Sequence, residues 1–212
     1  MANRKYNKKF YEKYAILSLS TCYDKRFFEL MKFDNEKIES PDFQSAKLDI
    51  GIEVTEAITT KQGNHRYIIN QYFGQGLRGE EIKEAAEKRF LKIVGRISVY
   101  DGHAIYSEHD GLSDFRGTIR LVIEKIMEKT EKLNRIYKQF GRNWLYVYTH
   151  EVFEPSDIDQ IVDGIRHDHP LDFDKVFINC IDRLYVISNY SKIEIIEVEN
   201  ETLRQIKKAA FE

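Results

Sequence analysis

Apolar and polar residues alternate most regularly at residues 49–55, where every second position is apolar. The apolar positions are Ile50, Ile52 and Val54. A period of two is typical of a β-strand with one buried face, because successive side chains point to opposite sides. Pro41 cannot donate a ladder hydrogen bond, so we place it at the start of a preceding strand. The pattern predicts a short strand, a turn near residues 45–46 and a longer strand within 41–55.

A second pattern, with steps of three and four, runs through residues 116–140 and predicts one long helix with a single apolar stripe. The stripe consists of Ile119, Ile123, Ile126, Thr130, Leu133, Tyr137 and Phe140. Such a stripe packs more often on a sheet than in a coiled coil. The run 144–148 that follows is almost continuously apolar, which is typical of a buried central strand.

The remaining patterns predict a mixed central sheet flanked by helices, that is, an α/β fold. Further helices are expected at 6–18, 23–33, 79–94, 155–165 and 201–211. Further strands are expected at 66–73, 97–106, 176–179, 184–187 and 192–198, with a loop at 107–115. We expect one domain over 1–212, made of N-terminal helices (1–35), a core (41–150) and a C-terminal helix, hairpin and helix (151–212).

Composition excludes several classes of protein. The chain has 212 residues, of which 42% are hydrophobic and 32% charged, so it is neither disordered nor a membrane protein. No apolar run approaches the ~20 residues of a spanning helix. The first residues are basic with no apolar stretch after them, unlike a secretory signal. Two cysteines fit a reducing compartment, so we expect a cytoplasmic location.

The formal net charge of -2 hides a segregation of charge along the chain. Residues 116–142 carry eight basic and three acidic side chains, whereas residues 151–182 carry nine acidic and two basic ones. A local basic stripe is what a phosphate backbone would contact, although a solvated helix face is the simpler interpretation. If DNA is the partner, the expected contacts are Lys125, Lys129, Lys132 and Arg135.

The most informative acidic residues are Asp42, which follows Pro41, and Glu53 on the longer strand. Two carboxylates on adjacent strands of a hairpin can converge within metal-binding distance. Such hard oxygen ligands suit Mg²⁺ or Mn²⁺, which keep waters and accept phosphate oxygens. Glu53 lies on the strand face opposite the apolar positions, so it does not belong to the apolar stripe.

The segments Pro41-Asp42 and Glu53-Val54-Thr55 resemble the sequence motif of the PD-(D/E)xK nuclease superfamily, in those members where a hydroxyl residue replaces the motif lysine. The resemblance implies a restriction-endonuclease-like αβββαβ core and metal-dependent hydrolysis of DNA. It also implies metal ligation by Asp42, Glu53 and the Val54 carbonyl. A helix before the hairpin often donates a further acid in this family, and Glu29 is the candidate.

Thr55 cannot supply the charge of the family's lysine, which positions and activates the attacking water. Lys88 and Lys92 share one face of the helix expected at 79–94, so they are the sequence's candidates for that role. The alternative is a catalytically inactive nuclease-fold binding module. Assembly as a homodimer stays open.

A glycine-rich loop supports a third interpretation, a nucleotide-binding α/β protein. Gly74, Gly76 and Gly79 fit GxGxxG before a helix, and Asp101 follows Gly79 by 22 residues, the spacing of a ribose-binding acid. Against it, Glu80 and Glu81 would place negative charge where a pyrophosphate needs positive potential.

Overall fold

The computed structural model describes residues 3–27, 32–33, 41–58, 76–88, 96–100, 103–107, 115–149, 151–166, 173–180, 183–189 and 191–211. The chain divides into two compact units. The larger unit comprises Met1–Ala57 and Ile119–Glu212, and the smaller comprises Ile58–Thr118. The range 41–150, expected to form one core, is thus shared between two units, because the smaller unit is inserted in the sequence between the hairpin and the long helix.

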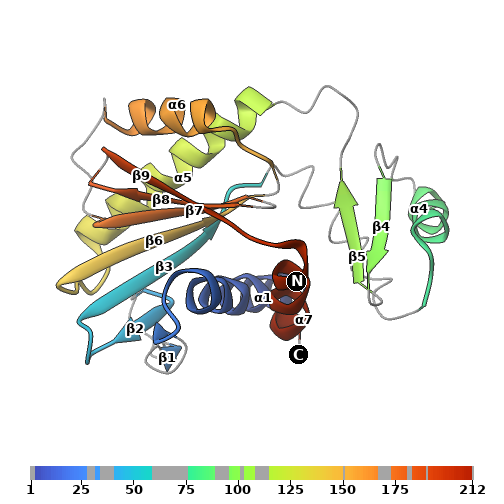
Figure 1. The fold of residues 1–212 in the computed structure, drawn as a ribbon, viewed down its shortest axis with the longest axis horizontal. Coiled ribbons are helices and arrows are strands. Elements are labelled where there is room, and N and C mark those ends of the chain that lie inside the picture. Colours follow the sequence, from blue (N-terminus) through green and yellow to red (C-terminus); the bar gives the residue numbers. More distant parts are fainter. Residues whose placement is uncertain are drawn as a thin grey trace. The chain divides into compact units, whose positions relative to one another are not determined.

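The larger unit is built on a seven-stranded mixed sheet (Figure 1). Its strands, in spatial order, are β1 (Lys32–Phe33), β2 (Phe43–Ser45), β3 (Ile50–Glu56), β6 (Arg142–Tyr148), β7 (Lys175–Asn179), β8 (Arg183–Ser188) and β9 (Lys192–Glu197). The three central strands β3, β6 and β7 are parallel, and all other neighbours are antiparallel. The α/β class with a mixed central sheet is therefore confirmed.

Helices cover both faces of this sheet (Figure 1). The helices that the structure describes here are α1 (Asn3–Ser18), α5 (Phe115–Arg135), α6 (Pro155–Arg166) and α7 (Asn200–Phe211), and a π-helical turn η1 (Leu19–Tyr23) extends α1. Helices α1 and α7 lie on one face, and α5 and α6 on the other. Helices α5 and α6 lie in the connections from β3 to β6 and from β6 to β7, which join parallel strands. Because such connections are right-handed and both run in the same direction across the sheet, their helices lie on the same face.

The main hydrophobic core lies between the sheet and α1. Ile50, Ile52 and Val54 face this core, as the alternation predicts, and so do Trp144 and Phe177 on the neighbouring strands. The last two rings pack with centroids 5.4 Å apart. Because side chains alternate along a strand, the residues between the apolar positions of β3 are directed to the face that α5 covers.

Glycines allow close packing on the α5 face. A Cβ atom at Gly51 would lie 2.6 Å from Cδ2 of Phe140 and 2.9 Å from Cγ of Pro41. A Cβ atom at Gly164 of α6 would lie 2.6 Å from Cδ1 of Ile123 on α5. Real Cβ contacts are longer, so any larger residue would force these neighbours to move.

Two predictions for the larger unit are wrong in detail. The helix expected at 23–33 does not reach its end, because Lys32 and Phe33 form β1 and pair with Gln44 and Phe43. Pairing across the sheet overrides the local periodicity there. The helix expected at 116–140 ends at Arg135, before the last two residues of its stripe.

The smaller unit contains α4 (Gly79–Glu87) and a hairpin of β4 (Arg96–Tyr100) and β5 (His103–Ser107). The single strand expected at 97–106 is thus two antiparallel strands. The strand expected at 66–73 lies outside the described residues. No helix in the described part of the chain is long and apolar enough to cross a membrane.

Candidate functional site

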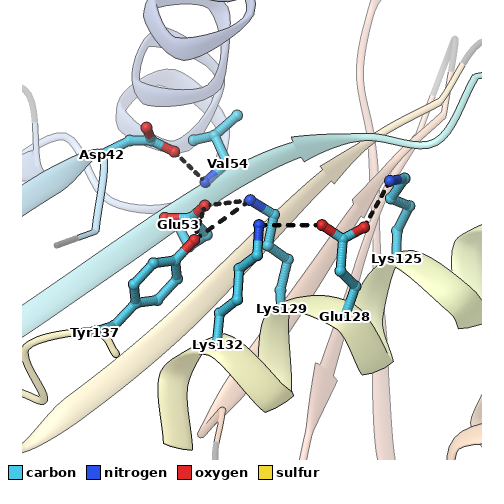
Figure 2. Close-up of polar contacts among 8 residues, drawn as sticks. All are labelled: Asp42, Glu53, Val54, Lys125, Glu128, Lys129, Lys132 and Tyr137. Atoms are coloured by element: carbon cyan, nitrogen blue, oxygen red, sulfur yellow. Dashed lines mark hydrogen bonds and ion pairs between the residues drawn. The ribbon is translucent and has the colours of Figure 1, made fainter. Parts of the chain in front are cut away.

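Glu53 lies in the middle of β3, between the hairpin strand β2 and the parallel strand β6. Its side chain is directed toward α5, away from the core that Ile52 and Val54 enter (Figure 2). The residue is only 5% exposed. A buried carboxylate needs a compensating charge or hydrogen bonds, because burial otherwise disfavours its ionised form strongly.

Lys129 of α5 and Tyr137 supply these partners. Lys129 Nζ lies 2.6 Å from Glu53 Oε1, and the Tyr137 hydroxyl donates to the same oxygen at 3.0 Å. The lysine side chain is only 14% exposed, so the ion pair is largely shielded from water. Tyr137 reaches Glu53 from the segment beyond α5, as Figure 2 shows.

Asp42 lies next to this ion pair, at the start of the hairpin. Phe43, the next residue along the chain, is paired with Ile52, the residue before Glu53. Asp42 Oδ2 also accepts a hydrogen bond of 2.8 Å from the Val54 amide (Figure 2). The hairpin therefore brings Asp42 close enough for its charge to raise the pKa of Glu53.

The environment of Glu53 raises its pKa to about 6 from an ordinary 4.5. Burial is the largest cause, and the nearby charge of Asp42 adds to it. The Lys129 charge and the hydrogen bonds from Lys129 and Tyr137 act in the opposite direction. A carboxyl group whose pKa lies near neutrality and next to a second acid is typical of functional sites.

This pKa predicts a pH dependence of stability. Between pH ~4.5 and ~6 the folded protein binds more protons at Glu53 than the unfolded chain does. The Glu53 contribution to the free energy of unfolding should therefore fall as pH rises through this window, by about 2 kcal/mol in total. Urea unfolding of wild type and Glu53→Gln at several pH values measures it.

The difference in free energy of unfolding, wild type minus variant, should decrease from pH 4.5 to pH 6.5. Parallel stability curves for the two proteins would contradict the raised pKa. The glutamine keeps the shape of the side chain, so the pH slope and not the absolute stability is the quantity compared.

Further lysines line α5 beside the acids. Glu128 accepts from Lys125 at 2.7 Å and pairs with Lys132 at 3.2 Å. Figure 2 shows these side chains along the helix edge next to Glu53. The lysines are 33% and 38% exposed, so they border the shielded ion pair with solvent-accessible positive charge.

The structure places the residues expected to contact DNA differently from one another. Lys129 was expected to face outward but is directed to the sheet and paired with Glu53. Lys125 and Lys132 are partly exposed, and Arg135 pairs with Glu131 at 2.7 Å. Their contact with DNA stays a prediction.

The structure describes only some of the other expected site residues. Thr55 is half-buried on β3, two residues after Glu53 and on the same face. Lys88 is exposed at the end of α4 in the smaller unit. Glu29 and Lys92 lie outside the described residues, so the predictions for them stay open.

The sequence did not identify Lys129 and Tyr137 as partners of Glu53, although a signal exists. Lys129 follows Ile126 by three residues and precedes Leu133 by four. These spacings place the lysine on the sheet-facing side of the helix. A lysine within an apolar stripe indicates a buried acid opposite it, which no local pattern at 116–140 can locate.

The donor set of this site fits a hard divalent cation. Among the residues that the structure describes, Glu53 Oε2 accepts no hydrogen bond, whereas Oε1 accepts two. Adjacent acids of like charge favour a bound cation, and Mg²⁺ is held by one or two carboxylates together with waters and phosphates. No group of three potential metal-ligating side chains occurs within the described ranges.

The glycine loop gives little support to a nucleotide-binding site. Gly76 has a left-handed φ of 70°, and Glu80 and Glu81 occupy the first turn of α4. The Arg78 amide already donates to Glu81 Oε2 at 2.7 Å. The helix N-terminus is thus capped by an acid, which opposes a phosphate there. Gly74 and Asp101 lie outside the described residues.

Comparison with known proteins found no matching family, no matching curated protein and no matching solved structure.

Proposed function

We propose that this protein is a metal-dependent phosphodiesterase of PD-(D/E)xK type that hydrolyses DNA. One observation carries the proposal: the Lys129 ammonium lies 2.6 Å from Glu53 Oε1, next to Asp42. The sequence has Thr55 where the family has its lysine, and a helix lysine beside the acids supplies the missing positive charge.

The chain order supports this assignment. Helix α1 precedes β1, β2 and β3, and α5 leads to β6, which follows the αβββαβ order of the resemblance. The four strands are neighbours in that order, with β3 and β6 parallel. Asp42 precedes the first strand of the hairpin and Glu53 lies in the second, where the motif requires them.

In this proposal Asp42, Glu53 and the Val54 carbonyl hold Mg²⁺ or Mn²⁺. The cation supplies a Lewis acid that stabilises negative charge developing on the phosphate. The residues of the chain orient the metal ligand: Tyr137 and Lys129 hold the Glu53 carboxylate through Oε1, and Oε2 would be left for the cation. Both lysine and tyrosine thus act on the geometry of the metal ligand.

Lys129 has a second role in the proposal. Its ammonium offers positive charge to the scissile phosphate in a shielded setting, where a charge is worth more than in water. Lys125 and Lys132 extend this charge along α5 toward solvent, where they would contact neighbouring phosphates. Such contacts position a nucleic acid without reading its sequence.

The proposal is tested by incubating supercoiled, linear duplex and single-stranded DNA with the protein in Mg²⁺ or Mn²⁺. We expect cleavage that EDTA abolishes and that Asp42→Asn lowers by at least ~10²-fold. Gln44→Ala, at a half-buried β2 position two residues away, is the matched control and should keep the activity. Equal cleavage by wild type and Asp42→Asn would attribute the activity to a contaminant.

The second candidate is an inactive nuclease-fold module that binds nucleic acid, and Thr55 favours it. In that case DNA binds without being cleaved in any metal. Counterion release then predicts that log affinity falls with log salt at a slope of about -0.9 for each phosphate contact. Fluorescence anisotropy at several salt concentrations measures this slope, and Lys125→Gln with Lys132→Gln should reduce it.

A further inference from the structure

A hollow of about 360 Å³ opens on the sheet face opposite Glu53, at the starting ends of β3, β6 and β7. Its walls come from η1 and the residues after it, from the turn before β3, and from the first residues of β6 and β7. The lining residues are Tyr23, Asp24, Arg26, Phe27, Leu48, Ile50, Arg142, Trp144 and Lys175. Its volume lies within the range of small-ligand sites.

The charge around this hollow is predominantly positive. Three cationic side chains line it against one acid, and that acid, Asp24, is already held by Arg26 through contacts of 2.7–3.2 Å. The hydrogen bonds from Arg26 lower the pKa of Asp24 to about 2. Arg142 and Lys175 form no ion pair with any carboxylate that the structure describes; Arg142 donates to the Leu48 carbonyl, and Lys175 to Ser188 Oγ.

Aromatic rings form the inner wall. Trp144 packs against Phe27 and Tyr23, with ring centroids 5.2 and 6.0 Å apart. The Lys175 ammonium lies 5.3 Å from the Tyr23 ring centroid and 6.0 Å from that of Trp144. Cation and rings therefore stand side by side, an arrangement that suits a planar ring carrying a negative group.

Trp144 belongs to the wall of the hollow but is only 4% exposed. Its indole N–H has no hydrogen-bond acceptor among the described residues and is covered by neighbouring atoms. A ligand in the hollow can therefore contact the edge of the ring but not the N–H.

We propose that this hollow binds a nucleoside monophosphate, with its phosphate on Arg142 and Lys175 and its base against Tyr23 and Phe27. Inorganic phosphate can contact only the cations of the hollow, and a nucleoside can contact only its rings. A ligand that carries both groups should therefore bind more tightly than either one. The site is separated from Glu53 by the sheet, so the proposal does not depend on the nuclease proposal.

Trp144 is the only tryptophan of the chain, so its fluorescence reports directly on this hollow. Titration with AMP, in EDTA so that metal-dependent cleavage plays no part, should change the emission in a saturable way. Inorganic phosphate and adenosine should each bind at least ~10-fold more weakly than AMP. Equal affinity of inorganic phosphate and AMP would overturn the assignment of the rings to a base.

Substitutions of the lining residues test whether AMP binds in this hollow. Arg142→Met and Lys175→Met should each weaken AMP binding by at least ~10-fold, since each removes a charge-assisted hydrogen bond. Lys208→Met, at an exposed position of α7, is the matched control and should bind AMP as wild type does. Unchanged affinity in both pocket variants would overturn the proposal.

Thermal unfolding of Arg142→Met and Lys175→Met separates binding from folding. Both variants should unfold cooperatively, so that calorimetry attributes their weaker AMP binding to the missing charge. A 5′-phosphorylated oligonucleotide compared with its unphosphorylated form then distinguishes a strand end from a free nucleotide: selective binding of the phosphorylated strand assigns the site to strand ends, and binding of AMP alone to free nucleotides.

Discussion

Replacing Lys129 with Met should lower metal-dependent DNA cleavage by at least ~10²-fold while metal binding is retained. The ammonium is the only charged side chain that the described residues place on the Glu53 carboxylate. Loss of one preorganised donor at developing charge typically costs two to three orders of magnitude in rate. Single-turnover cleavage of a defined duplex, with calorimetric titration of Mn²⁺, measures both quantities.

Two controls accompany this variant. Lys132→Met removes a partly exposed charge one helical turn away and should reduce the rate much less. Lys88→Met tests the lysine that the sequence favours, and a larger loss there than in Lys129→Met would assign the role to Lys88. Since Lys129→Met leaves a buried carboxylate without its cation, thermal unfolding of this variant itself, beside the double variant Lys129→Met/Glu53→Gln, establishes whether the fold is retained.

Divalent cations should raise the melting temperature of the wild type by several degrees. A ligand at a hundredfold excess over its dissociation constant adds about 2.7 kcal/mol to the free energy of unfolding. The charge of Asp42 disfavours the ionised form of Glu53, and a bound cation removes that repulsion. Differential scanning calorimetry with Mg²⁺, Mn²⁺ or EDTA measures the shift.

Asp42→Asn should abolish this shift, because it removes one ligand and half of the repelling pair. The same variant in EDTA should lose little stability, because an asparagine Oδ1 can still accept the 2.8 Å hydrogen bond from the Val54 amide. A metal-induced shift of wild-type size in Asp42→Asn would place the cation elsewhere and remove the metal site from the nuclease proposal.

Much of the sheet could be predicted from short patterns. The alternation at 49–55 places Ile52 and Glu53 on opposite faces, and the continuous apolar run at 144–148 becomes the buried strand β6. These patterns succeed because a strand has a fixed period of two and because a central parallel strand is buried on both faces. The end of α5 was not predictable in this way, since residues 136–140 continue the helical period.

The sequence by itself determined the hairpin and the face on which Glu53 lies. Both follow from the local period of two. Only the tertiary structure decided which cation neutralises Glu53. Lys129 lies 76 residues further along the chain, beyond an inserted unit, and its place within the apolar stripe does not reveal which acid it meets. That pairing depends on how α5 docks on β3, and Tyr137 reaches the same oxygen from beyond the end of the helix at Arg135.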